Sequence, residues 1–220
     1  MHRLIVGGTS GLGLELARSF RDSGDDVTVT GRRELIEDGL DVVHLDLAEP
    51  ELPARIGEMV MQLPEVNSLV YAAGYYQEGR VTDLSDEQIE QMLSVGGRGL
   101  IYATREVLAK QDRLDELITI TSTSQWTPRE LEPIYNYTKA GEAHFSHAIA
   151  QDPRVEKVLV VGPAGMDTDF WRDREDMDTS TYNDPADVAT EIMELRRAEY
   201  GYRFAKILRD PLSTEIVETS

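Results

Sequence analysis

Short runs of apolar, β-branched residues alternate along this chain with longer segments of helical periodicity. The apolar runs cover residues 4–6, 27–30, 42–45, 69–72, 117–121 and 157–161, and they predict buried strands. Between them, apolar side chains recur at every third or fourth position, as at Leu12, Leu16 and Phe20, which predicts amphipathic helices. This alternation predicts an α/β fold in which a doubly wound parallel β-sheet is flanked by helices, a three-layer α/β/α arrangement.

The chain beyond these strands is less regular. Residues 166–184 are polar with embedded aromatic side chains and predict an irregular loop beside the substrate. Asp184 is suited to cap, and Pro185 to begin, a last helix over 185–200, and a short strand is expected near 203–207. We expect residues 210–220 to form a loose tail. The 220 residues fit one domain, 1–220.

The composition of the chain excludes some classes of binding partner but says little about the reaction. A formal net charge of −19 repels nucleic acid and anionic membrane surfaces, and no apolar run is long enough to span a bilayer, so neither partner is expected. The first residues enter the first predicted strand without the apolar stretch of a signal peptide, which favours a cytoplasmic protein. The absence of cysteine excludes thiol catalysis and disulfides.

The first predicted strand ends in a glycine-rich turn, and helical periodicity follows at once. Such a turn lets a pyrophosphate approach backbone N–H groups at the positive end of the helix. It therefore predicts a Rossmann-type dinucleotide site, although a turn that is merely tight is the alternative. The expected contacts are Gly7, Thr9, Ser10, Gly11, Leu12 and Gly13.

Two arginines after the second predicted strand bear on the choice of cofactor. The planar guanidinium of Arg32 or Arg33 suits the 2′-phosphate of NADP(H), whereas a carboxylate there would repel it. We therefore expect NADP(H) to be preferred, with NAD(H) left open and with solvated loop charges as the alternative. Asp46 and Leu47, after the third predicted strand, are expected at the adenine end of the cofactor.

Tyr135, Lys139 and Ser122 form a candidate catalytic group. Tyr135 and Lys139 are four residues apart on one face of a predicted helix, so the ammonium can lie beside the phenol and lower its pKa. Tyr135 then acts as a general acid or base, and Ser122, at the end of the fifth strand, orients a carbonyl oxygen. The alternatives are a packing tyrosine, a solvated lysine and a serine that caps the strand end.

These motifs together resemble the short-chain dehydrogenase/reductase family over about residues 3–200. The resemblance is carried by the spacing Gly7-x3-Gly11-x-Gly13, by Ala72-Ala73-Gly74 after the fourth strand, by Ser122 with Tyr135-x3-Lys139, and by residues 163–168 after the sixth strand. It implies an NADP(H)-dependent carbonyl reductase or alcohol dehydrogenase in which Lys139 also holds the nicotinamide ribose. Further cofactor contacts implied in this way are Ala72, Ala73, Gly74, Pro163, Gly165, Met166 and Thr168. The resemblance also implies dimers or tetramers that pair the helices near 85–110 and 135–151.

One position departs from the family. Many of its members carry an asparagine that supports a water chain to the lysine, and alignment with the family's glycine at Gly99 places Gly96 there. Either water replaces the missing side chain or turnover is slow. Because interior glycines weaken a helix, Gly96, Gly97 and Gly99 also predict a local break.

Aromatic residues near the catalytic group predict a pocket for a partly apolar carbonyl compound. The candidates are Tyr75, Gln125, Trp126, Phe170 and Trp171, with Tyr76 and Tyr182 beside them. His144 and His147 lack a third ligand at suitable spacing, so no metal is expected. A different class stays open: a non-catalytic sensor or scaffold that binds NADP(H), motivated by Gly96 and by the short segment after Thr168.

Overall fold

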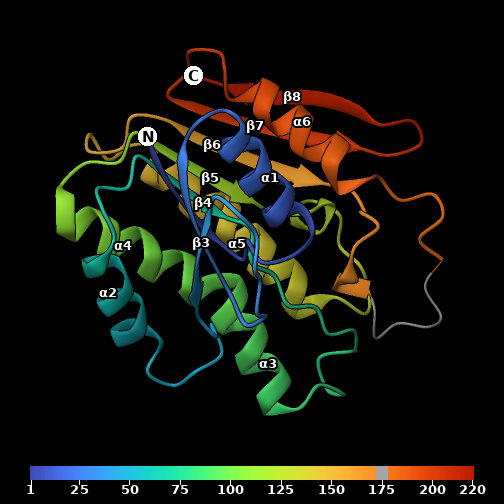
Figure 1. Ribbon diagram of the computed structural model, residues 1–220. Coiled ribbons are helices and arrows are strands. Elements are labelled where there is room, and N and C mark those ends of the chain that lie inside the picture. Colours follow the sequence, from blue (N-terminus) through green and yellow to red (C-terminus); the bar gives the residue numbers. More distant parts are fainter. Residues whose placement is uncertain (172–177) are drawn as a thin grey trace.

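The computed structural model describes residues 1–171 and 178–220 (Figure 1). Its strands are β1 (His2–Val6), β2 (Asp26–Gly31), β3 (Leu40–His44), β4 (Ser68–Tyr71), β5 (Glu116–Ile120), β6 (Val158–Pro163), β7 (Tyr202–Leu208) and β8 (Ser213–Thr219). Its helices are α1 (Gly11–Asp22), α2 (Leu52–Gln62), α3 (Asp86–Leu93), α4 (Gly99–Gln111), α5 (Pro133–Ile149) and α6 (Pro185–Leu195). Short helical turns are η1 (Ser94–Arg98), η2 (Thr123–Gln125) and η3 (Asp169–Trp171).

Within these residues the strands form one sheet in the order β3-β2-β1-β4-β5-β6-β7-β8. All neighbouring pairs are parallel except β7 and β8, which confirms the predicted doubly wound α/β fold. The chain adds strands on one side of β1 up to β3 and then starts again on the other side with β4. Such a switch point opens a crevice at the carboxyl ends of β1 and β4, where doubly wound proteins bind ligands.

Two apolar cores hold the layers together. One core packs α1 and α6 against the sheet, with Leu16, Phe20 and Ile192 fully buried. The other packs α2, α4 and α5 against the opposite face, with Ile56 and Leu100 almost fully buried. Figure 1 shows these two groups of helices on either side of the sheet. The central strands are buried on both faces, which explains their continuous apolar runs.

The C-terminus differs from the expected loose tail. Residues Ser213–Thr219 form strand β8, which pairs with β7 in antiparallel register. The sequence pattern did not show this strand because its side chains are almost all exposed, so no buried face imposes an apolar alternation. The last helix also ends at Leu195, before the expected residue 200, while Asp184 caps its start through a bond from the Ala186 N–H.

The predicted break at the glycines is a π-helical turn, η1, between α3 and α4. A Cβ atom at Gly96 would lie 2.7 Å from the Cβ of Thr138 on α5, and one at Gly99 would overlap the hydroxyl of Tyr71 on β4. The helix backbone therefore packs directly against its neighbours at both glycines. At the start of the turn, the Ser94 hydroxyl donates a hydrogen bond to the Leu47 carbonyl at 2.6 Å.

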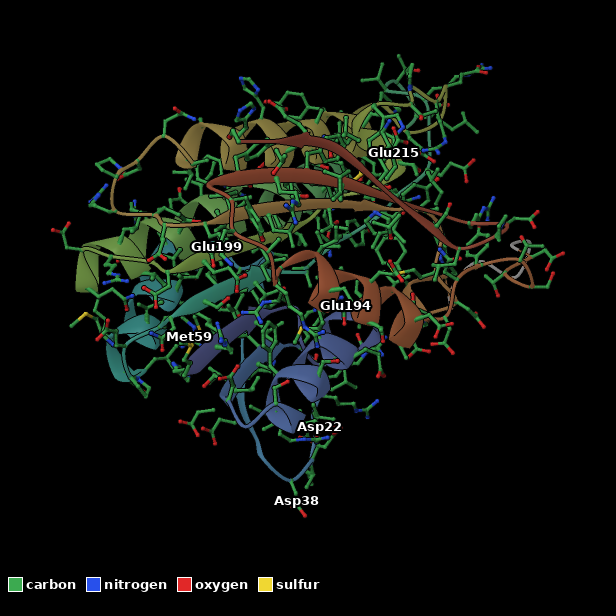
Figure 2. The ribbon with its side chains drawn as sticks, turned by 90° about the horizontal axis from the view of Figure 1, so that it is seen from above. Asp22, Asp38, Met59, Glu194, Glu199 and Glu215 are labelled. Atoms are coloured by element: carbon green, nitrogen blue, oxygen red, sulfur yellow. The ribbon has the colours of Figure 1, made fainter. Side chains whose placement is uncertain are left out.

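Acidic side chains lie around the surface rather than in one patch. Figure 2 labels five of them, on α1, on α6 and the segment after it, on β8 and on the loop between β2 and β3: Asp22, Asp38, Glu194, Glu199 and Glu215. No helix in the described part of the chain is both long and apolar enough to cross a bilayer.

Adding a methyl group at two glycines of the η1 region, Gly99 and Gly97, is expected to affect the stability of the fold differently. We expect Gly99→Ala to lower the free energy of unfolding by about 1–3 kcal/mol, because the new Cβ overlaps the buried Tyr71 hydroxyl. Gly97→Ala is the matched control, since a Cβ there meets no described atom within 4 Å. It should be neutral or stabilising by up to about 1 kcal/mol. Urea unfolding followed by circular dichroism measures both, and equal effects would contradict the packing argument.

Candidate functional site

The glycine turn after β1 lies against the end of β4. Gly7 has a φ of +86° and Gly11 a φ of +53°, a backbone region that favours glycine. A Cβ at Gly7 would lie 2.6 Å from the Ala73 N atom, and one at Gly13 would overlap the Gly7 carbonyl oxygen. The turn is therefore closed to side chains, and the predicted residues Gly7 and Ala73 are brought together at the switch point.

Helix α1 begins within this turn, at Gly11. Its N-cap residue, Ser10, makes no side-chain hydrogen bond to the first turn, and no acidic side chain lies there. The first N–H groups are thus left at the positive end of the helix dipole, where an anion is stabilised. Together with the glycine cradle, this fits the pyrophosphate of a dinucleotide.

The segment after β6 covers the same turn. A Cβ at Gly11 would lie 3.3 Å from Cγ2 of Thr168, so Thr168 faces the glycine turn. Pro163 is the last residue of β6, Met166 forms a bridge with Asn183, and Gly165 packs against the Tyr182 ring. The predicted irregular loop 166–184 lies outside the described residues from 172 to 177.

The residues predicted to select the cofactor lie in different surroundings. Arg32 is exposed, and Arg33 forms an ion pair with Asp169, Nη1 to Oδ2 at 2.5 Å. Asp46 accepts a hydrogen bond from the Ala48 N–H and so stabilises its own turn. Leu47 is buried in the core beneath α2 and α4. A phosphate group that binds Arg33 must therefore displace the Asp169 carboxylate.

The candidate catalytic residues lie together where β5 ends and α5 begins. Tyr135 and Lys139 belong to the buried stripe of α5, at 9% and 3% exposure. Ser122 is the N-cap of η2, two residues after the end of β5, and it lies close enough to the Tyr135 phenol to act on its pKa. The Lys139 Nζ atom lies 5.8 Å from the centre of the Tyr135 ring. The structure thus brings together three residues that the sequence places up to 17 positions apart.

Hydrogen bonds fix the η2 segment to α5. The Asn136 amide donates to the carbonyl oxygens of Ser124 and Thr127, the latter at 2.8 Å. The Arg129 guanidinium donates to the Ser124 hydroxyl at 2.6 Å and pairs with Glu132 at 3.0 Å. These bonds hold the Ser122 segment against the first turn of α5, next to Tyr135.

The pKa of Tyr135 is raised, not lowered as the sequence led us to expect. Burial is the largest cause, and the Glu142 charge adds to it. Lys139 and Ser122 act in the expected direction, but they do not outweigh burial. The phenol is therefore protonated at neutral pH and available as a proton donor.

Glu142 is part of this group, and the sequence reading missed it. Its side chain is fully buried and forms an ion pair with Lys139, Oε2 to Nζ at 2.8 Å. Burial raises the pKa of Glu142 to about 7, against the opposing effect of Lys139. Lys139 also donates to the Ile120 carbonyl at 3.2 Å. The signal that could have found Glu142 is its position three residues after Lys139, on the buried face of the helix.

Aromatic rings cover Tyr135. The Tyr76 ring lies 5.1 Å from that of Tyr135 and 5.5 Å from that of Trp171, and Phe170 lies 6.5 Å from Tyr135. The Trp171 ring also packs against Tyr182, at 5.8 Å. A Cβ at Gly74 would lie 3.5 Å from the Phe170 ring and 3.9 Å from Lys139 Nζ. Phe170 and Trp171, both predicted to line a pocket, thus lie over the catalytic group together with the strand end at Gly74.

The other predicted pocket residues have different surroundings, and of these Tyr75 lies against the cluster around Tyr135. Trp126 packs on β7, with its ring 5.7 Å from that of Phe204 and 5.0 Å from Lys206 Nζ. The Gln125 side chain accepts a hydrogen bond from Thr121 at 2.7 Å, beside β5. Tyr75 packs against both the core beneath α2 and α4 and the small cluster around Tyr135.

The two histidines of α5 do not lie in a group of metal ligands. The His147 ring stacks on Tyr202 at 4.0 Å. Across residues 1–171 and 178–220, no three or more histidine, cysteine, aspartate or glutamate side chains gather closely enough to hold a metal ion.

Comparison with known proteins finds a family model and curated relatives that match most of this chain. The family model described as short chain dehydrogenase matches residues 2–179. An uncharacterized oxidoreductase of Bacillus subtilis (strain 168) is 27% identical over 169 residues, and the match covers 71% of this chain and 64% of the Bacillus protein. An uncharacterized oxidoreductase of Staphylococcus aureus (strain MRSA252) is 24% identical over 215 residues, covering 86% of this chain and 88% of that protein. The chain thus spans somewhat less than two thirds of the first relative.

Solved structures share the fold. Serine dehydrogenase from Escherichia coli superposes with a TM-score of 0.74 at 26% identity, over 90% of this chain and 92% of that one. A closed form of serine dehydrogenase complexed with NADP+ reaches a TM-score of 0.78 at 24% identity, over 93% and 94%. The ligand-free aldohexose dehydrogenase of Thermoplasma acidophilum reaches 0.81 at 20% identity, over 97% and 96%.

The closed glycine turn predicts the effect of a methyl group on nucleotide binding. We expect Gly13→Ala to weaken the binding of NADPH at least about tenfold, or about 1.4 kcal/mol, because the new Cβ overlaps the Gly7 carbonyl and displaces the turn. Gly57→Ala on α2 is the control, since its Cβ would have only an ordinary contact, 3.5 Å from Glu106. Fluorescence titration measures both affinities, and circular dichroism checks that each variant is folded. Unchanged binding by folded Gly13→Ala would contradict the assignment.

Proposed function

This chain belongs to the short-chain dehydrogenase/reductase family and is an oxidoreductase, and we propose that it is an NADP(H)-dependent carbonyl reductase or alcohol dehydrogenase. The observation that carries the proposal is the position of the Tyr135 phenol. It lies between Ser122 and Lys139, beneath the aromatic rings and beside the strand end at Gly74. A substrate oxygen in this place meets a hydrogen-bond donor and a proton donor at once.

When bound, the cofactor supplies the hydride that adds to the carbonyl carbon. The Ser122 hydroxyl donates a hydrogen bond to the carbonyl oxygen and orients it. The Tyr135 phenol then transfers its proton to that oxygen, which becomes the alcohol. The Lys139 ammonium stabilises the phenolate that is left behind, because opposite charges attract strongly in a buried site. The oxidation of an alcohol follows the same steps in reverse.

The raised pKa of Tyr135 favours reduction over oxidation. A general acid must carry its proton at working pH, and burial keeps the phenol protonated. Alcohol oxidation would instead need the phenolate. The partly exposed Phe170 and Trp171 rings support a substrate with an apolar part next to its carbonyl group.

Arg33 supports the preference for NADP(H) over NAD(H). Its guanidinium lies after β2, where the fold places the adenine ribose, and it already binds an anionic group, the Asp169 carboxylate. A 2′-phosphate offers more charge and more acceptor oxygens than a carboxylate, and would replace Asp169 on Arg33. The solved serine dehydrogenase complexed with NADP+ is a related fold with that cofactor.

The second candidate function is a sensor or scaffold that binds NADP(H) without turnover. It is motivated by Gly96, where Thr138 fills the space that a family asparagine side chain would take. It predicts firm cofactor binding without NADPH oxidation on any carbonyl compound, so the variants below distinguish it from the reductase.

Removal of one hydroxyl tests the catalytic role. We expect Tyr135→Phe to lower kcat by about 10²- to 10⁴-fold in NADPH oxidation with aldehydes, ketones or quinones, because the proton donor is lost. Cofactor binding should change little. Tyr137→Phe is the matched control, because this tyrosine lies on the same helix but is 68% exposed. Equal activity of the wild type and Tyr135→Phe would contradict the proposal, and a wild type that binds NADPH but turns nothing over would favour the sensor.

Removal of one guanidinium tests the cofactor preference. We expect Arg33→Ala to weaken NADPH binding about tenfold or more and to leave NADH binding unchanged, because a charge-assisted hydrogen bond contributes about 1.5–3 kcal/mol. Arg113→Ala is the control for the loss of one positive charge, since Arg113 pairs with Asp115 and Glu156 on another part of the surface. Parallel titrations with both cofactors measure the effect. An equal loss for NADPH and NADH would overturn the preference.

A further inference from the structure

The short η3 turn, Asp169–Trp171, contacts two distant parts of the candidate site. The Asp169 carboxylate pairs with Arg33, Oδ2 to Nη1 at 2.5 Å, although the two residues are 136 positions apart in the chain. The next residue, Phe170, places its ring 6.5 Å from the ring of Tyr135. Consecutive residues therefore connect the arginine that is expected to select the cofactor with the aromatic cover of the proposed proton donor.

Hydrogen bonds make η3 and the residues before it one compact unit. The Phe170 N–H donates to the Thr168 hydroxyl at 3.4 Å, and the Trp171 N–H donates to the Thr168 carbonyl at 3.2 Å. The Trp171 indole N–H donates to the Met166 carbonyl at 3.1 Å. The Phe170 and Trp171 rings pack edge to face, with their centres 5.0 Å apart. A displacement of Asp169 therefore carries both rings with it.

This unit closes the approach to the proposed proton donor. Tyr135 is 9% exposed, and the Tyr76 and Phe170 rings pack on it. A substrate oxygen must come within about 2.6–3.2 Å of the phenol to receive its proton. Tyr76 follows β4, whereas Phe170 and Trp171 belong to the unit that Asp169 anchors. Movement of η3 therefore uncovers one side of the phenol.

The ion pair between Arg33 and Asp169 holds the unit only weakly. Their side chains are 39% and 57% exposed, and such a pair shifts an equilibrium by no more than about fivefold, because water screens both charges. A phosphate group carries about two negative charges and three acceptor oxygens, and a planar guanidinium can bind two of these oxygens at once. The 2′-phosphate of NADP(H) is thus a stronger partner for Arg33 than a carboxylate, whereas the 2′-hydroxyl of NAD(H) is a weaker one.

We propose that Asp169 is a specificity-determining residue, which occupies Arg33 until the 2′-phosphate of NADP(H) displaces it and thereby releases η3 from its position over Tyr135. The inference rests on the proposed function and adds a second effect of the 2′-phosphate, on the substrate side of the site. NAD(H) carries a hydroxyl at that position and leaves the ion pair intact. Discrimination between the two cofactors then acts both on binding at Arg33 and on access to Tyr135.

The opposite arrangement is a clasp, in which the pair of Arg33 and Asp169 closes over a nucleotide that lies beneath it. A clasp stabilises the bound nucleotide whether or not it carries a 2′-phosphate, so removal of the Asp169 charge would weaken the binding of both kinds. Competition by Asp169 has the reverse consequence, because its removal strengthens the binding of nucleotides with a 2′-phosphate and of no others.

The first test follows η3 without any substrate. The chain has two tryptophans, so Trp126→Phe leaves Trp171, in η3, as the only reporter. Adenosine 2′,5′-bisphosphate and adenosine 5′-monophosphate differ only in the 2′-phosphate. We expect the bisphosphate to increase the quenching of Trp171 fluorescence by acrylamide, and the monophosphate at saturation to leave it unchanged. With Asp169→Asn added, quenching should already be high without nucleotide. Equal responses to the two nucleotides would overturn the proposal.

A second reporter covers the case in which Trp126→Phe does not fold. Fluorine-19 NMR of 5-fluorotryptophan in the otherwise unchanged chain gives one signal for each tryptophan, assigned by exchange of one tryptophan at a time. The Trp171 signal should move with the bisphosphate and stay in place with the monophosphate. A Trp171 signal that both nucleotides leave in place would contradict the release of η3.

The second test measures nucleotide affinity by calorimetry. We expect Asp169→Asn to bind adenosine 2′,5′-bisphosphate up to about fivefold more tightly than the wild type and to bind the monophosphate equally well. Glu156→Gln is the matched control, because it removes the same charge from another exposed ion pair, with Arg113. Tighter binding of both nucleotides would show a general charge effect, and weaker binding of both would show a clasp. Either result would overturn competition at Arg33.

The third test measures turnover with any carbonyl compound that the wild type reduces. Asp169→Asn should raise kcat/KM for this compound up to about fivefold with saturating NADH, because η3 is released without a 2′-phosphate. With saturating NADPH the value should stay within about twofold of the wild type. Unchanged turnover with NADH would contradict the effect on access to Tyr135. A wild type that reduces no compound would reject the reductase proposal instead, and the nucleotide tests would still decide whether Asp169 competes for Arg33.

Discussion

The close approach of backbone to backbone at the carboxyl ends of β1 and β4 is the constraint on which this site depends. Gly7 lies against Ala73, and Gly13 lies against the Gly7 carbonyl, at distances that leave no room for a Cβ atom. This packing brings the positive end of α1, the end of β4 and the segment after β6 to one place. Because these strands are parallel, their carboxyl ends all lie at the same edge of the sheet, where the site is formed.

Burial on α5 sets the chemistry at that edge. Tyr135, Lys139 and Glu142 lie on one face of the helix, where water is excluded and charges interact strongly. Burial raises the pKa of both Tyr135 and Glu142, while Lys139 keeps its charge because Glu142 offsets the cost of burying it. The ammonium therefore serves two neighbours, the phenol on one side and the carboxylate on the other.

The glycines of η1 connect this chemistry to the packing of the helices. The π-helical turn lets the chain pass close to Tyr71 and Thr138, at Gly99 and Gly96, and it leaves space beside Gly97. The same stretch thus closes the position of the family asparagine and leaves a groove beside α5. The structure thus explains why glycine replaces the family asparagine at position 96: the Thr138 side chain on α5 occupies the space that a larger residue would need.

The sequence by itself determined the doubly wound fold, the glycine turn and the spacing of Ser122, Tyr135 and Lys139, because apolar periodicity, turn chemistry and helical spacing are local properties. It also showed that a helix is interrupted at the glycines. Only the tertiary structure decided that β8 covers the edge of the sheet, that Trp126 packs on β7, and that the pKa of Tyr135 is raised. These features depend on contacts between residues far apart in the chain and on how deeply each group is buried. The position of Glu142 beside Lys139 follows from helical spacing, but its burial comes from the packing of α5, which no local pattern records.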